Sequence, residues 1–135
     1  MKTLEIYLAG ACKYENDEGL SWREELKNNW EDQDLGIHLI NPLDYFRYSE
    51  NWHQNEKQVK QYYFSRIRKS DVLLVNLNNS DSSCGTCQEV QYAIDHEIPV
   101  IGFGHENVYN WLTIDCQCIF DSAEEAMEYI VTYYT

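Results

Sequence analysis

Four short runs of apolar residues divide the chain and predict its strands. They cover residues 4–9, 37–40, 72–77 and 98–103. The apolar positions within each run are nearly continuous instead of alternating with polar ones, which is typical of strands buried on both faces. A weaker run at residues 118–120 is expected to add a short fifth strand.

The stretches between these runs carry apolar residues at helical spacing. Residues 20–30, 56–69 and 86–96 are therefore predicted to be helices. A last helix is expected from Ser122, because Glu125 follows three positions later and the two residues have the pattern of a capping box.

The alternation of strands and helices predicts the fold class. Strands connected through helices favour a parallel sheet with right-handed crossovers. We therefore expect a three-layer α/β architecture, Rossmann-like or flavodoxin-like, with a parallel sheet of about five strands flanked by helices. The sequence contains no linker, repeat or low-complexity segment, so residues 1–135 are expected to form a single domain.

The chain is strongly acidic, which narrows the range of partners. Ten Lys and Arg residues against 23 Asp and Glu residues give a formal net charge of -13. Such a charge repels a nucleic-acid backbone and an anionic membrane surface, so we expect neither as a partner. The first apolar run is too short for a signal peptide, and no run approaches the roughly 18 apolar residues of a spanning helix. We expect a cytoplasmic protein.

Five cysteines in such a chain are expected to be reduced thiols. Two of them, Cys84 and Cys87, form the motif CGTC at the start of a predicted helix. A dithiol redox site has this pattern, because a helix N-terminus lowers the thiol pKa of the first cysteine. A zinc site formed together with Cys116 and Cys118 is a second alternative, and ordinary small residues are the third.

Glycine-rich phosphate loops are missing from the sequence. The segment GACKYENDEG, which follows the first predicted strand, does not contain G-x-G-x-x-G, and no G-x-x-x-x-G-K-[ST] occurs elsewhere. Dinucleotide-binding and P-loop sites are therefore not predicted. A small polar ligand near Gly10 and Ala11 remains open.

The most informative segment runs from Asp71 to Ala93, where a buried strand leads into a Ser/Gly turn and a helix. Ligands of open α/β sheets bind at the carboxyl ends of strands, and a helix N-terminus offers free N–H groups. Helical spacing places Glu89 on the same face as Gly85. Such a carboxylate can attack the anomeric carbon of a sugar, whose oxocarbenium-like transition state needs a nearby negative charge. The alternative is a glutamate favoured there by the helix dipole alone.

Four segments, IYLAG, SDVLLVN, SSCGTCQEVQYA and IPVIGFG, together resemble the nucleoside 2-deoxyribosyltransferase family over about residues 4–104. In that family a segment S-x-G-T-x-x-E carries the catalytic glutamate. Ser83, Gly85, Thr86 and Glu89 match it position by position. The family's parallel five-stranded sheet agrees with the fold predicted above.

The resemblance implies N-glycosidic chemistry on a nucleoside or nucleotide, without a cofactor or a metal. Glu89 would attack C1′ of a deoxyribonucleoside, expel the base, and pass the sugar to another base or to water. Tyr7 matches a family residue whose hydroxyl is placed to orient this carboxylate. Tyr45, Phe46 and Trp52, in the aromatic loop of residues 41–55, are expected to stack on the base; a loop that only packs its own rings is the alternative. Family members form dimers or larger oligomers, so a homo-oligomer is expected.

Two positions depart from the family's pattern. Tyr63 stands where members commonly carry an aspartate that binds the sugar hydroxyls or transfers a proton to the base. A phenol, with an ordinary pKa near ~10, is a donor at neutral pH and not a carboxylate base. Cys84 stands where some members carry a second aspartate, with Asp81 nearby as a substitute. A non-catalytic protein that binds a nucleotide or a nucleotide-derived signal in the same pocket is therefore the alternative function.

The predicted site thus has two groups of residues. Glu89 and Tyr7 are expected to act in catalysis. The residues expected to bind the substrate are Gly10, Asp44, Tyr45, Phe46, Trp52, Tyr63, Asn76, Ser83, Gly85 and Thr86.

Overall fold

A five-stranded parallel sheet forms the centre of the computed structural model, which describes residues 3–12, 15–17, 19–46 and 56–135. The strands are β1 (Leu4–Gly10), β2 (Ile37–Ile40), β3 (Val72–Asn76), β4 (Val100–Phe103) and β5 (Cys118–Phe120). Their order across the sheet is β2-β1-β3-β4-β5, and all neighbours are parallel. The chain places β2 on one side of β1 and then crosses over to place β3 on the other side. The strand order therefore reverses between β1 and β3, and open α/β sheets bind ligands at such a switch point.

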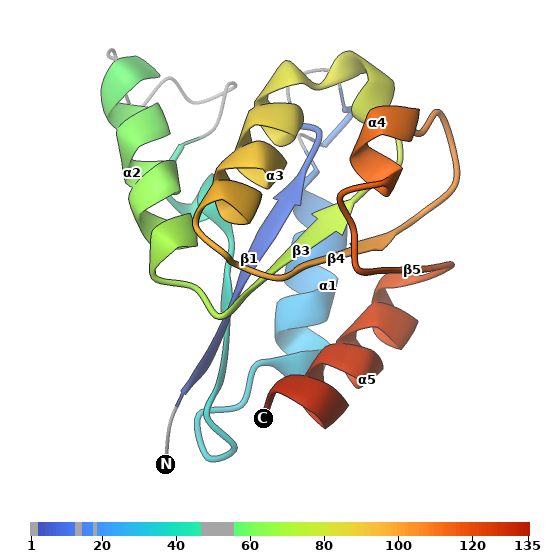
Figure 1. The fold of residues 1–135 in the computed structure, drawn as a ribbon. Helices are drawn as coiled ribbons and strands as arrows, with labels where there is room; N and C mark the ends of the chain where they lie inside the picture. Colours follow the sequence, from blue (N-terminus) through green and yellow to red (C-terminus); the bar gives the residue numbers. More distant parts are fainter. Residues whose placement is uncertain (1–2, 13–14, 18, 47–55) are drawn as a thin grey trace.

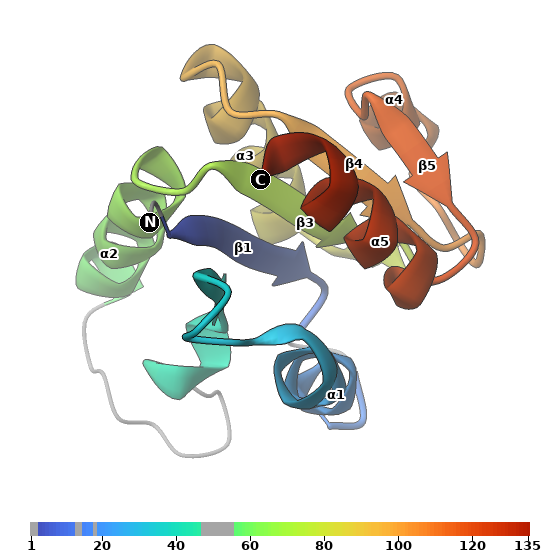
Figure 2. The ribbon, with the colours of Figure 1, turned by 90° about the horizontal axis from the view of Figure 1, so that it is seen from below.

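Helices cover both faces of this sheet (Figures 1 and 2). One face carries α1 (Leu20–Trp30) and α5 (Ala123–Tyr134), and the other carries α2 (Glu56–Arg68), α3 (Cys84–Asp95) and α4 (Asn110–Thr113). The flavodoxin-like, three-layer fold predicted from the alternation of strands and helices is therefore confirmed.

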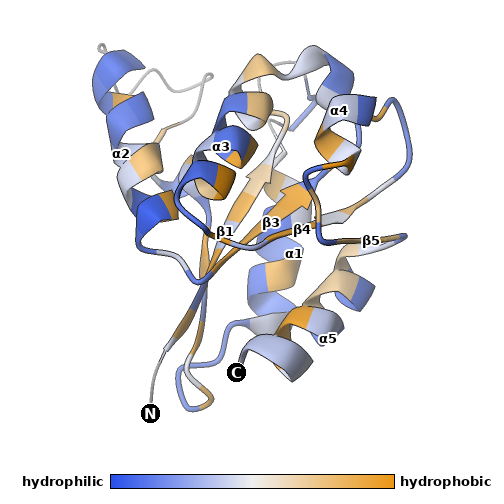
Figure 3. Cartoon of the chain, in the orientation of Figure 1, coloured by the Kyte–Doolittle hydropathy of each residue, from blue (hydrophilic) through white to orange (hydrophobic). Residues whose placement is uncertain are grey.

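Two apolar cores, one on each side of the sheet, hold the layers together. Successive side chains of β1 point to opposite faces. Ile6 and Leu8 pack in the core beneath α1 and α5, whereas Tyr7 and Ala9 pack in the core beneath α2, α3 and α4. All four side chains are fully buried. Figure 3 shows the same division, with apolar strands at the centre and polar outer faces on the helices.

The ends of several helices follow local sequence signals. The N-terminus of α5 is capped as predicted, because the Ser122 hydroxyl accepts a hydrogen bond of 3.2 Å from the backbone N–H of Glu125. Helix α3 begins at Cys84, two residues before the predicted start. The reason is Ser83, whose side chain accepts a hydrogen bond from the Thr86 N–H and thereby serves as the N-cap.

Three short elements were not predicted. These are α4 and two 3-10 helices, η1 (Pro42–Asp44) and η2 (Ser80–Ser82). Elements of three or four residues are too short to show a hydrophobic period, so the sequence pattern gives no signal for them. Part of the aromatic loop, residues 47–55 with Trp52, lies outside the described residues. Among the described helices, none has the length and apolar character needed to cross a membrane.

Candidate active site

A cavity of about 500 Å³ opens at the carboxyl ends of β1, β2 and β3. Its wall combines the residues that follow β1, the η1 turn, one side of α2 and the N-terminal half of α3. The lining residues are Gly10, Ala11, Cys12, Arg23, Pro42, Leu43, Phe46, Glu56, Val59, Lys60, Tyr63, Phe64, Ser82, Ser83, Cys84, Gly85, Thr86, Gln88 and Glu89. The cavity thus lies where the sheet topology predicts a ligand site.

Glu89 and Tyr7 are joined at this cavity. The Tyr7 hydroxyl donates a hydrogen bond of 2.6 Å to the Oε2 atom of Glu89. Tyr7 is fully buried in β1, the strand between β2 and β3, and Glu89 is half-buried in α3. A hydrogen bond to one carboxylate oxygen limits the orientations of the side chain, and Glu89 lines the cavity. The strand and the helix together therefore hold one oriented carboxyl group.

The surroundings of this pair set its protonation. Burial raises the pKa of Glu89 to about 7, while the Tyr7 hydrogen bond and the positive charge of Arg23 act in the opposite direction. Burial, followed by the neighbouring Glu89 carboxylate, raises the pKa of Tyr7 well above its ordinary value. Tyr7 therefore stays a hydrogen-bond donor, and Glu89 changes charge close to neutral pH.

The N-terminal turn of α3 forms another part of the wall. The Ser83 hydroxyl accepts a hydrogen bond of 3.4 Å from the Thr86 N–H and lies 2.6 Å from the Thr86 hydroxyl. Next to them, a side chain at Gly85 would have no neighbouring atom within 4 Å, so glycine leaves open space there. The four matched residues of the SCGTCQE segment, Ser83, Gly85, Thr86 and Glu89, thus all line one cavity.

Comparison with known proteins identifies the family. The sequence model of the nucleoside 2-deoxyribosyltransferase family matches residues 6–127. The chain belongs to this family. No curated protein matches the sequence. The nucleoside 2-deoxyribosyltransferase resemblance drawn from the sequence segments is therefore confirmed.

Solved structures share the nucleoside 2-deoxyribosyltransferase fold at low sequence identity. A 2-deoxyribosyltransferase from Leishmania mexicana superposes with a TM-score of 0.76 at 19% identity, covering 98% of this chain and 99% of that one. A 2-deoxyribosyltransferase from Bacillus psychrosaccharolyticus gives 0.69 at 19% identity, covering 90% and 88%. A conserved protein from Enterococcus faecalis V583 gives 0.76 at 16% identity, covering 98% and 99%. At these identities the likeness concerns the fold alone.

Tyr63, which replaces an aspartate expected from the family pattern, lies in the cavity wall. Its hydroxyl donates a hydrogen bond of 2.9 Å to the backbone carbonyl of Pro42. Its ring meets the Tyr7 ring edge to face, with 6.5 Å between the centroids. Tyr63 therefore connects α2 to the η1 turn and brings a phenol, instead of a carboxylate, to this wall.

Three residues expected to bind substrate do not line the cavity. Asp44 is exposed and pairs with Lys27 at 3.4 Å. Tyr45 has 40% of its surface exposed and packs its ring on Tyr62, at 4.5 Å between centroids. Asn76 accepts a hydrogen bond of 3.0 Å from the Asn78 N–H through its side-chain oxygen, which shapes the turn after β3. Each of these three side chains has a protein partner nearby, including Tyr45, which was expected to stack on the base.

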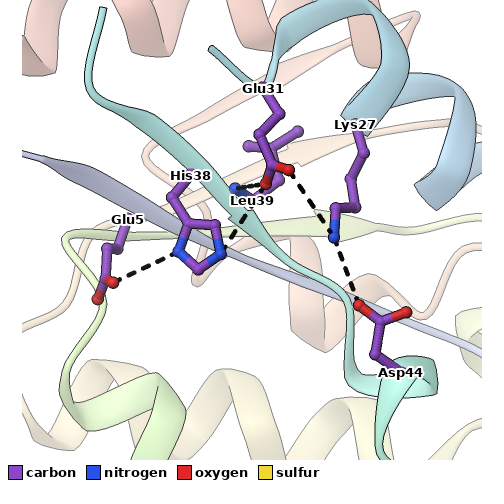
Figure 4. A network of polar contacts seen from close by, with 6 residues as sticks. All are labelled: Glu5, Lys27, Glu31, His38, Leu39 and Asp44. Atoms are coloured by element: carbon purple, nitrogen blue, oxygen red, sulfur yellow. Dashed lines mark hydrogen bonds and ion pairs between the residues drawn. The ribbon is translucent and has the colours of Figure 1, made fainter. Parts of the chain in front are cut away.

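Asp44 belongs to a separate polar network on the outer strand of the sheet (Figure 4). Lys27 lies between Asp44 and Glu31, and His38 lies between Glu31 and Glu5. These contacts, of 3.4 to 4.0 Å, connect α1, β2 and β1 at the surface. The network accounts for the orientation of Asp44 without a ligand.

Arg23 is a charged residue of the cavity wall that the sequence analysis did not predict. Its side chain is completely buried and lines the cavity. The missed signal is its position in α1: Arg23 lies three residues after Leu20 and three before the buried Leu26, on the apolar face of the helix. A charged residue on such a face is unusual and indicates a buried charge with specific hydrogen-bond partners.

None of the five cysteines forms a disulfide. Burial raises the pKa of the thiol of Cys87, the second cysteine of the CGTC motif. Burial also raises the pKa of Cys116, to about 12. Within the part of the chain that the structure describes, His, Cys, Asp and Glu side chains form no group of three or more that could hold a metal ion. Cys12 and Cys84 line the cavity as small side chains.

Proposed function

We propose that the chain breaks the N-glycosidic bond of deoxyribonucleosides or their nucleotides, with Glu89 as the nucleophile. The observation that carries the proposal is the 2.6 Å hydrogen bond from Tyr7 to the Glu89 carboxyl at the wall of a cavity of about 500 Å³. Membership of the nucleoside 2-deoxyribosyltransferase family supports the substrate class. The cavity volume suits a ligand of nucleoside size.

The reaction follows from the chemistry of a fixed carboxylate. The free Glu89 oxygen forms a bond to C1′ while the bond from C1′ to the base nitrogen breaks, and the departing base keeps the bonding electrons and takes up a proton. A second base or a water molecule then attacks C1′, loses a proton, and releases Glu89 as a carboxylate. Tyr7 holds the carboxylate in one orientation during both steps.

Tyr63 defines how this site differs from the family pattern. Its hydroxyl is engaged with the Pro42 carbonyl, so the wall near Tyr7 offers a phenol where a carboxylic acid would assist the departing base. Without that acid, bases that leave easily are expected to react faster than bases that need protonation.

The substrate panel tests the proposal. Purified protein is incubated with deoxynucleosides and their 5′-monophosphates, with and without adenine as acceptor, and free base and exchanged nucleoside are separated by chromatography. Exchange indicates a transferase, and release of free base alone indicates a hydrolase. The Glu89→Gln variant is the matched control, because the change is nearly isosteric and removes only the charge. Equal turnover by this variant would contradict the proposal.

A second function is favoured by one observation, the phenol at position 63 in the cavity wall. A protein that has lost an acid for the leaving base can still bind a nucleotide or a nucleotide-derived signal. Absence of turnover by the wild type, together with a thermal shift produced by a nucleotide, would support this binding function.

A further inference from the structure

The guanidinium of Arg23 is a charge buried in the wall of the cavity. Arg23 is fully buried, and it is the largest of the fully buried side chains in the described part of the chain. A guanidinium stays protonated in proteins, so this burial places a permanent positive charge next to the cavity. Burying a charge costs free energy unless hydrogen bonds compensate for the lost water. The hydrogen-bond partners of Arg23 therefore indicate which parts of the fold it holds in place.

Three backbone carbonyls accept hydrogen bonds from this charged group. The Nε atom donates to the Leu8 carbonyl at 3.1 Å, Nη2 donates to the Gly10 carbonyl at 3.1 Å, and Nη1 donates to the Gly19 carbonyl at 2.9 Å. Two of these carbonyls belong to the end of β1, and the third lies at the N-cap of α1. Among the described residues no carboxylate lies within ion-pair distance of Arg23, so its positive charge is not neutralised by contact with any of them.

The surrounding chain is shaped to admit the guanidinium. Gly19 has a positive φ of 78°, and a Cβ atom there would lie 2.5 Å from Nη1 of Arg23. The Trp22 ring also contacts the guanidinium, whose central carbon lies 4.6 Å from the ring centroid. Gly19 is thus required both by the backbone conformation and by the space that Arg23 occupies.

Arg23 also acts on the Tyr7 and Glu89 pair through space. Its charge lowers the pKa of both groups, against the effect of burial on each of them. Among the described residues, the other titratable groups that line this cavity are Cys12, Glu56, Lys60, Tyr63 and Cys84. Arg23 is buried and held by three hydrogen bonds, whereas Lys60 is exposed on α2. Arg23 is therefore a fixed positive charge of the site.

We infer that Arg23 is a positioning residue of this site: its guanidinium fixes the backbone at the end of β1 and supplies a buried positive charge, in the wall of the same cavity, that favours the ionised form of the Glu89 carboxyl. The inference deepens the proposed function and rests on it for the effect on turnover. The electrostatic interaction between Arg23 and Glu89 does not depend on turnover of a nucleoside. It can therefore be measured separately from activity.

The test is a titration of the Glu89 side chain by NMR, with glutamate-selective 13C labelling and the Glu89→Gln variant to identify the signal. Arg23→Gln removes the charge and keeps one polar amide group at this position. We expect it to move the Glu89 midpoint upward by roughly one pH unit, the lower end of the effect of an opposite charge on a carboxyl group. Lys27→Gln, which removes a cation from the surface of the same helix, is the matched control and is expected to leave the midpoint unchanged.

A second measurement uses the intact chain, in case Arg23→Gln does not fold. The Nε–H signal of Arg23 in the wild type is expected to shift with the same midpoint as Glu89, and to stop shifting in Glu89→Gln. An unchanged Glu89 midpoint in a folded Arg23→Gln, or an Arg23 signal that does not respond to the Glu89 titration, would overturn the inference. Failure of the proposed function has a different signature, because the wild type would then show the coupled titration and no turnover.

Discussion

The Tyr7 hydroxyl and the Glu89 carboxyl, 82 positions apart in the chain, meet in a hydrogen bond of 2.6 Å. Tyr7 comes from the interior strand β1, and Glu89 comes from the second turn of α3. Because both elements are anchored in the same apolar core, the bond joins two rigid parts of the fold. It is therefore suited to hold one carboxylate oxygen toward the cavity within narrow limits.

Tyr7→Phe is expected to lower kcat/KM by about 10- to 100-fold, because the carboxylate loses its orientation and a hydrogen bond that favours its charged form. The acidic limb of the pH profile is expected to move to higher pH in the same variant. Steady-state kinetics over a range of pH check both effects. Tyr134→Phe is the control, since it removes a tyrosine hydroxyl that bonds Gln117 far from the cavity. A Tyr7→Phe enzyme as active as this control would show that the hydroxyl has no positioning role.

The wild-type pH profile is the second prediction. Burial raises the pKa of Glu89 to about 7, and only the carboxylate form can attack C1′. We therefore expect kcat/KM to rise with pH through a midpoint close to 7, because this parameter reports the free enzyme. A profile that is flat between pH 5 and pH 8 contradicts the assignment of Glu89 as the ionising nucleophile.

The raised pKa of Glu89 also makes the stability of the fold depend on pH. The folded-state pKa of Glu89, about 7, lies above its ordinary value of 4.5, so the folded chain binds the proton more tightly than the unfolded chain. This contribution to stability is fully present below pH 4.5 and is lost as the pH rises through 7. Glutamine has no ionisable carboxyl group, so Glu89→Gln does not lose this stability as the pH rises. The variant is expected to gain on the order of 2 kcal/mol in unfolding free energy, relative to the wild type, between pH 4.5 and pH 8.

Urea denaturation of the two proteins at pH 4.5 and pH 8 measures that difference. Glu128→Gln, an exposed glutamate of α5, serves as the control and is expected to show no pH-dependent gain. If Glu89→Gln is destabilised equally at both pH values, the raised pKa is not a property of the folded chain.

Tyr63 offers a gain-of-function test. Tyr63→Asp returns a carboxyl group to the wall beside Tyr7 and is expected to raise turnover of nucleosides whose base needs protonation. Tyr63→Asn is the matched control, because it loses the same ring and the same hydrogen bond to Pro42 but gains no acid. Equal activity of the two variants would assign Tyr63 to packing alone.

The fold was largely predictable from the sequence, because its strands are buried on both faces. Continuous apolar runs marked β1, β2, β3 and β4, and the helical spacing between them marked the long helices. The elements that escaped prediction, α4, η1 and η2, are single turns without a period. Their conformation depends on packing against the rest of the chain, which a local pattern does not encode.

The candidate site was predictable only in part. The spacing of Gly85 and Glu89 placed these residues on one helix face, and both line the cavity. The partner of Tyr63 is a backbone carbonyl, and the partner of Asp44 is a lysine from another element. Contacts of this kind depend on tertiary geometry and have no sequence signature. Arg23 did have a signal, a charge on an apolar helix face, but its role emerges only from the three carbonyls around it.

The central claim is that Glu89 attacks the sugar, and the most direct test is to look for the covalent product. The protein is mixed with a deoxynucleoside that it turns over, quenched in acid within the first turnover, digested, and analysed by mass spectrometry. We expect a deoxyribosyl group on the peptide that contains Glu89, and its loss in Glu89→Gln. Turnover that leaves this peptide unmodified at every time point, or a sugar attached to a different residue, would contradict it.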